Sequence, residues 1–248
     1  MISEHDARQL ADRFDELEGS YARKYGLGSQ ARAFFLMEEL VTMRFALLEA
    51  HPDAAPVLER QRRSTALKLQ SLYDASPFPD GPAPPVRRPP GDAGVIEFDR
   101  EVFAEKYAAA AELIQCDVVA LENWKPESQS RPTAYMYVVD EDFKMRVWVR
   151  QFRMSDLVLG RNRATVSGVP VAHPMLVPER LRVRAAGEIT PIFGDQITGV
   201  VANLKSGHFR PSPEAALSVR RACAESLGLA AESCDVLTVP DVPGNSPQ

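Results

Sequence analysis

Hydrophobic residues follow a helical period over the first part of the chain. Residues Ser3 to Asp6 have the pattern of an N-terminal capping box. The apolar positions that follow are spaced as on one face of a helix: Leu10, Phe14, Leu17 and Tyr21. Beyond Gly26–Gly28, where Ser29 can cap the next helix, a second segment is apolar around most of its circumference, and a third covers residues 54–73. The pattern predicts a small helical bundle with the second helix at its centre.

The chain then becomes rich in proline. Residues 77–90 hold seven prolines, a density that excludes helices and inner strands and is typical of an extended connector. We therefore predict a helical domain over residues 1–76, a linker over residues 77–92 and a second domain over residues 93–239. Residues 240–248 are predicted to be a disordered tail.

Beyond the linker the period changes to that of strands. Residues 133–139 have high strand propensity, and residues 144–150 alternate between apolar and polar side chains, so together they predict a hairpin. A second pair of strands is predicted over residues 180–185 and 196–204, with a turn at Phe193–Asp195.

Shorter elements are predicted around these hairpins. Ser212 is expected to cap a last helix, with Pro213 at its first position and Gly228 at its end. The remaining predictions are a strand over residues 95–98, a helix over residues 103–116 and an edge strand over residues 235–239. The order of elements predicts an α+β protein, in which a helical bundle precedes a mostly antiparallel β-rich domain with a C-terminal helix.

Composition favours a cytoplasmic protein. The 248 residues are 45% hydrophobic, enough for a sizeable core. No stretch approaches the roughly 20 apolar residues that cross a bilayer, and the N-terminus lacks the features of a signal peptide, so no membrane partner is expected. Cys116, Cys223 and Cys234 lack metal-ligand spacing and are expected to be reduced thiols. The sequence predicts no metal site and indicates no cofactor.

Charge is unevenly distributed. The net charge of −5 argues against a nucleic-acid binder, but residues 141–221 hold 13 Lys and Arg against 7 Asp and Glu. This basic segment can attract a phosphate or an acidic partner, or it can be an ordinary solvated surface. Its arginines at predicted exposed strand positions are Arg146, Arg150, Arg180, Arg182 and Arg184. Trp148 is the one aromatic residue on that face suited to stacking on a base.

The segment from Asn203 to Pro211 is the candidate site. The short catalytic motifs of phosphate-binding loops, nucleophile elbows and metalloproteases are absent from the sequence. Here a strand ends, Gly207 permits a positive φ, and His208 and Arg210 stand just before a helix N-terminus, a corner that can hold an anion. A structural role stays open, in which His208 donates to a carbonyl and Arg210 pairs with an acid such as Glu188.

Motifs over residues 133–228 resemble a known family. The segments that carry the resemblance are Tyr135–Asp140, Asp156–Gly160, His173, Ala185–Ile189 and Ser206–Pro211. In this order they are similar to the C-terminal region of plant IQ-motif calmodulin-binding proteins and to uncharacterised bacterial proteins that share a Ser-Gly-His-Tyr/Phe-x-Pro motif. The resemblance implies a β-rich module in which His173, Glu188 and His208 lie close together.

The chain departs from that family in three places. His173 is followed by Pro-Met-Leu where the family has Ser-Ser-Phe-Leu, and Phe209 replaces a tyrosine. Ile114-Gln115 is not followed by the basic residues of a calmodulin-binding motif, so calmodulin binding does not carry over.

Three functional hypotheses follow. In the first, a binding or regulatory protein recognises a protein partner or a small anionic ligand through its β-rich domain, and the N-terminal helices are a candidate surface for self-association. Its binding residues are Asn203, Ser206, Arg210, Arg182 and Arg184.

The second hypothesis is an enzyme that acts on a phosphate-bearing or nucleotide-type substrate, for example an ADP-ribosyltransferase-like transferase. Its catalytic residues are His208 as acid or base, Glu188 as the group that orients it, and His173, while Arg210 holds the anion. The third hypothesis is a nucleic-acid binder that uses the arginine-rich strands.

Overall fold

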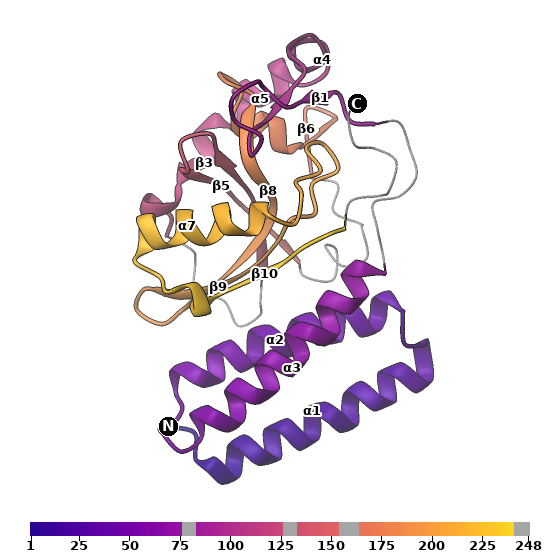
Figure 1. Ribbon diagram of the computed structural model, residues 1–248, viewed down its shortest axis with the longest axis vertical. Helices are drawn as coiled ribbons and strands as arrows, with labels where there is room; N and C mark the ends of the chain where they lie inside the picture. Colours follow the sequence, from indigo (N-terminus) through magenta and orange to yellow (C-terminus); the bar gives the residue numbers. More distant parts are fainter. Residues whose placement is uncertain (76–82, 126–132, 154–163, 241–248) are drawn as a thin grey trace.

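Three helices begin the chain in the computed structural model, which describes residues 1–75, 83–125, 133–153 and 164–240. They are α1 (Glu4–Tyr25), α2 (Gln30–Leu48) and α3 (Ala55–Asp74). The predicted capping box at the start of α1 is confirmed, because the Ser3 hydroxyl accepts the Asp6 N–H and the Asp6 carboxylate accepts the Ser3 N–H. Helix α2 packs against α1, α3 and the sheet, as expected of the central helix (Figure 1).

The inner face of α1 differs from the prediction. Leu17 is 38% exposed, whereas its neighbour Glu18 is buried. The Glu18 carboxylate accepts hydrogen bonds from Arg32 Nε of α2 at 2.9 Å and from Lys68 Nζ of α3 at 2.6 Å. Two cations compensate the burial of the acid, and this ion-pair network turns the leucine outward.

An eight-stranded, mostly antiparallel sheet forms the rest of the framework. Its strands are β1 (Val86–Arg87), β2 (Ile96–Phe98), β3 (Val118–Ala120), β4 (Thr133–Asp140), β5 (Met145–Arg153), β8 (Arg182–Phe193), β9 (Ile197–Asn203) and β10 (Cys234–Leu237). The main order is β1-β2-β8-β4-β5-β3, β9 pairs with β8, and β10 runs parallel to β9 at the edge. A separate small hairpin is made by β6 (Thr165–Val166) and β7 (Val169–Pro170).

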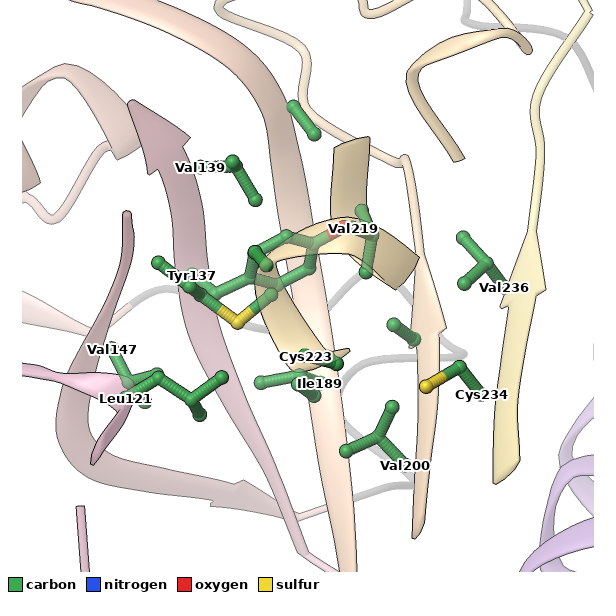
Figure 2. Packing of buried hydrophobic residues seen from close by; sticks show 14 of the residues in the cluster. Leu121, Tyr137, Val139, Val147, Ile189, Val200, Val219, Cys223, Cys234 and Val236 are labelled. Carbon is green, nitrogen blue, oxygen red and sulfur yellow. The ribbon is translucent and has the colours of Figure 1, made fainter. Parts of the chain in front are cut away.

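Helices cover both faces of the sheet. Helix α7 (Ala215–Leu227) packs on one face, where Tyr137, Ile189 and Cys223 belong to a buried cluster (Figure 2). The opposite face is covered in two parts. Helices α4 (Arg100–Lys106) and α5 (Ala108–Ile114), with the short helix η3 (His173–Leu176), cover the first part, and α2 and α3 cover the second. Three further short 3-10 helices are η1 (Gln115–Asp117), η2 (Leu121–Asn123) and η4 (Ala231–Ser233).

The N-terminal helices share a core with the sheet. Leu36 and Leu69 of these helices lie in one cluster with Val201 and Leu237 of the sheet. Beside this cluster, Asp235 of β10 accepts a hydrogen bond from Arg44 Nε of α2 at 2.8 Å and pairs with Arg62 of α3. These three charged side chains are at most 11% exposed, so a buried ion-pair network joins helices and sheet.

The predicted α+β class is confirmed, with several differences in detail. Residues 103–116 form α4, α5 and η1 rather than one helix, because the chain bends at Tyr107, whose φ is −128°. The described part of the predicted linker contains β1 at the edge of the sheet, and residues 76–82 lie outside the described residues. The predicted tail after Pro240 also lies outside them. No helix in the described ranges is long and apolar enough to cross a membrane.

Candidate functional site

The site lies where strand β8 changes partner. Along one edge, β8 pairs with β2 through residues 182–183 and with β9 through residues 189–193. Between these two ladders the Glu188 N–H donates to the side-chain oxygen of Asn203, at 3.2 Å. The Asn203 backbone passes so close to Gly187 that a Cβ there would lie 2.0 Å from the Asn203 carbonyl oxygen. Only glycine fits at this crossing.

His173 and Ser206 form a buried hydrogen-bonded pair at the crossing. His173 Nε2 lies 3.1 Å from the Gly187 carbonyl oxygen, which can only accept, so this nitrogen carries the proton. Burial, with His208 as a second cause, lowers the pKa of His173 to about 3, so the ring is neutral. Its Nδ1 is therefore an acceptor for the Ser206 hydroxyl, 3.1 Å away.

The geometry of Ser206 does not suit a nucleophile. Its side chain is 0% exposed, and its oxygen also accepts the backbone N–H of Phe209 at 3.3 Å. A serine that attacks a substrate must be reachable by that substrate. The Ser206–His173 pair instead holds in place the turn that contains residues 207–210.

His208 occupies the half-exposed edge of the cluster. Its Nε2 lies 3.2 Å from the hydroxyl of Tyr107, and the two rings meet edge to face at 5.7 Å. Phe98 and His173 lie on other sides of the imidazole, with ring centroids 6.4 Å and 6.3 Å away. Burial lowers the pKa of His208 and raises the pKa of Tyr107, so both side chains are neutral at pH 7. A neutral imidazole is a hydrogen-bonding group at both nitrogens.

Glu188 lies in the same region, but within the described ranges no hydrogen bond or ion pair joins it to either histidine ring. It is 9% exposed, on the sheet face that carries α4, α5 and the N-terminal helices. Burial raises its pKa to about 7, against the opposing effects of Asn203 and Lys205. Its Oε2 has no hydrogen-bond partner in the described ranges. The predicted orienting role of Glu188 toward His208 therefore gains no support from the contacts.

The turn from Ser206 to Arg210 is partly open to solvent. The Arg210 N–H closes the turn on the Ser206 carbonyl at 2.8 Å. Lys205 and Gly207 are exposed, and the side chains of His208 and Arg210 are half-buried. The residue with positive φ is Arg210, at 45°, and not Gly207, so the prediction for the glycine was wrong.

The N-terminus of α7 is already occupied by an acid. The helix begins at Ala215 with Glu214 as its N-cap, and the predicted cap through Ser212 is absent. A hydrogen bond from Ser212, with a second from its own backbone N–H, holds the pKa of Glu214 below its usual value. The positive end of the helix therefore already carries a negative side chain.

Two predicted binding residues lie elsewhere. Arg182 and Arg184 stand at the start of β8, where Arg182 Nε pairs with Glu97 at 2.8 Å and Arg184 pairs with Asp92. Arg184 also lies over the ring of Phe143, 4.1 Å from its centroid. They do not belong to the histidine cluster.

The other arginines of the basic strands are paired as well. Arg146, Arg150 and Arg180 meet Asp140, Asp117 and Asp142 at 3.8, 2.9 and 2.6 Å. Trp148, predicted to be exposed for stacking, is 4% exposed and lies in the core beneath α4 and α5. These contacts give little support to nucleic-acid binding, which needs unpaired cations and open aromatic rings.

The sequence analysis missed two tyrosines of the site. Tyr107 follows α4 and forms a hydrogen bond with His208, which lies 101 positions later in the sequence. Tyr73, in the last turn of α3, is close enough to Glu188 for the carboxylate to raise its pKa, although burial is the larger cause. In the sequence Tyr107 fits a helical pattern with Phe103 and Ile114, so neither pairing leaves a trace in local sequence.

The arrangement suits hydrogen bonding more than metal or covalent chemistry. In the described part of the chain, no group of three or more His, Cys, Asp or Glu side chains could hold a metal ion. Of the predicted site residues, the structure brings together His173, Glu188, Asn203, Ser206, His208 and Arg210.

Comparisons with known proteins leave the resemblance untested. No family model, no curated protein and no solved structure matches the chain. The similarity to the C-terminal region of plant IQ-motif proteins therefore stays a prediction that rests on the motifs alone.

Proposed function

We propose that this protein binds a small anionic ligand, with a phosphate or carboxylate group, at the turn from Lys205 to Arg210. The observation that supports this most is the pair of Tyr107 hydroxyl and His208 Nε2, 3.2 Å apart at the half-exposed edge of a buried cluster. The hydrogen bonds of Ser206 and His173 fix the turn from behind. Polar groups held in place in this way suit a ligand oxygen of defined position.

Charge supports an anion at this turn. Residues 205–210 include the cations Lys205 and Arg210 and no carboxylate. The nearby acid Glu214 is engaged by Ser212 and by its own backbone. Lys205 and Arg210 therefore attract a ligand phosphate to the turn.

Binding can be tested by NMR with defined probes. The protein is titrated with inorganic phosphate and separately with adenosine diphosphate, while the imidazole and backbone resonances of residues 205–210 are followed. We expect these resonances to shift at millimolar phosphate, and we expect the variants His208→Ala and Tyr107→Phe to weaken binding about tenfold, the loss of roughly one hydrogen bond to a charged group.

Arg180→Gln is the matched control, because Arg180 is an exposed cation already paired with Glu141 and Asp142. This variant should bind the probes as the wild type does. Resonances of residues 205–210 that stay unchanged with both probes, or equal losses of affinity in Arg180→Gln and His208→Ala, would remove the proposal.

The enzyme hypothesis has one observation in its favour. A neutral imidazole held by a tyrosine hydroxyl can accept a proton from a substrate hydroxyl or water. The test is release of nicotinamide from NAD⁺ by the pure protein, and its loss in His208→Ala. Release at the buffer rate, together with ligand binding as above, favours the binding function.

A further inference from the structure

Glu188 lies at the seam between helix α3 and the sheet, and its protonation can control that contact. We propose that the protonated Glu188 carboxyl allows the last turn of α3 to pack on β8 and β9, and that ionisation of this carboxyl loosens the turn. The protein would thereby carry a pH-sensitive contact between its N-terminal helices and its sheet. The inference does not depend on the ligand site.

The position of the side chain is the first support. Residues on either side of Glu188 on its face of β8, Ala186 and Ile192, belong to two different clusters. Ala186 packs under α4 and α5, whereas Ile192 packs under α2 and α3. Glu188 thus lies at the boundary between the two helical layers.

An unsatisfied oxygen of its carboxyl is the second support. Oε2 is buried and has no hydrogen-bond partner among the described residues. A buried carboxylate without a partner is strongly unfavourable, whereas the neutral acid is tolerated. The folded state therefore favours the proton, and loss of the proton favours any opening that lets water reach Oε2.

The groups around Glu188 offer little compensation for a negative charge. Tyr73 faces it from α3 and Asn203 from β9, and Tyr137 of β4 lies near it on the other face of the sheet; all three are neutral. The nearby His173 of η3 is neutral too, because burial lowers its pKa to about 3. Among the residues that the structure describes, Lys205 is the cation that acts on the carboxyl, and it is exposed, so water screens it.

The size of the effect follows from linkage. Burial raises the pKa of Glu188 from the usual 4.5 to about 7 in the folded protein. At about pH 6 an opened state with the usual pKa is already ionised, whereas the closed state changes from mostly protonated at pH 6 to mostly ionised at pH 8. The opening equilibrium should therefore rise about tenfold over these two pH units.

Hydrogen exchange followed by mass spectrometry tests the proposal. Protection factors of residues 69–75, corrected for the intrinsic pH dependence of exchange, are measured between about pH 6 and pH 8. We expect a fall of about tenfold in this turn and none in α7, which packs on the opposite face. In Glu188→Gln, which keeps the shape without the charge, protection of the turn should not depend on pH.

Glu39→Gln is the matched control. Glu39 is also a buried carboxyl whose pKa is raised by burial, but it accepts hydrogen bonds from Gln61 and Thr65 within the helices. This variant should keep the pH dependence of residues 69–75. If Glu188→Gln fails to fold, a ¹³C NMR titration of the Glu188 carboxyl in the wild type replaces it, with a midpoint near 7 expected.

Three results would overturn the proposal. They are a carboxyl midpoint near the usual value, a pH dependence that persists in Glu188→Gln, and an equal loss of protection in α7. The last result would mean that ionisation lowers global stability without acting on the α3 contact.

Discussion

The hydroxyl of Ser206 lies 3.1 Å from Nδ1 of His173, and both side chains are buried. Replacing Ser206 by Ala should leave Nδ1 buried without a donor and remove the acceptor of the Phe209 N–H. We expect a loss of about 1–3 kcal/mol in the free energy of unfolding, measured by urea denaturation. Ser71→Ala, which removes an exposed hydroxyl bonded to its own helix, is the control and should change stability by less than about 0.5 kcal/mol.

Because Asn203 passes close over Gly187, position 187 should not accept any residue with a side chain. In Gly187→Ala the added Cβ would lie 2.0 Å from the Asn203 carbonyl oxygen, and backbone on both sides must move to relieve the overlap. We expect a loss of more than about 3 kcal/mol, or no soluble folded protein. Gly28→Ala has open space around its Cβ and should be nearly neutral, so equal effects of the two variants in thermal denaturation would contradict this account.

The ion-pair network around Asp235 should be strongly sensitive to removal of its acid. Asp235→Asn keeps the shape of the side chain but leaves Arg44 and Arg62 buried without its charge. We expect a loss of about 3–5 kcal/mol by urea denaturation, because uncompensated buried charges are costly. Asp53→Asn, at an exposed acid, should cost less than about 0.5 kcal/mol. A small effect at residue 235 would mean that water reaches the network freely.

His173 should contribute to unfolding in acid. Burial lowers its pKa from the usual 6.5 to about 3 in the folded protein, so the unfolded chain binds the proton more readily. Its contribution to stability is complete above pH 6.5 and is lost as the pH falls from there toward 3. We expect His173→Gln to lose less stability than the wild type between pH 7 and pH 4 in urea titrations. The exposed His51→Gln is the control, and the two variants should differ in slope.

Local rules predicted most of the elements. The capping box at Ser3, the cap at Ser29 and the stop at Gly228, whose φ is 68°, satisfy backbone groups within a few residues of themselves. The hairpins also follow from strand alternation. The predictions that failed depend on residues distant in the sequence. On α1, for example, Glu18 is buried because Arg32 and Lys68 approach it from other helices.

The candidate site could be predicted only in part. The residues His173, Asn203, Ser206 and His208 were identified, and they do gather at one place. Their partner Tyr107 was not, because the hydrogen bond depends on how the α4–α5 segment packs over the sheet. The arginines on β8 were assigned to the site because the strand pattern marks them as exposed, and such a pattern cannot show which carboxylates lie opposite.

The contact between Asp235 and the two arginines has a consequence for synthesis of the chain on the ribosome. The helices that carry Arg44 and Arg62 emerge well before β10, which holds their counter-ion Asp235, 173 positions after Arg62. Until then the nascent helices lack both this acid and the Leu237 surface on which they pack. Docking of these helices must therefore wait until β10 has been synthesised.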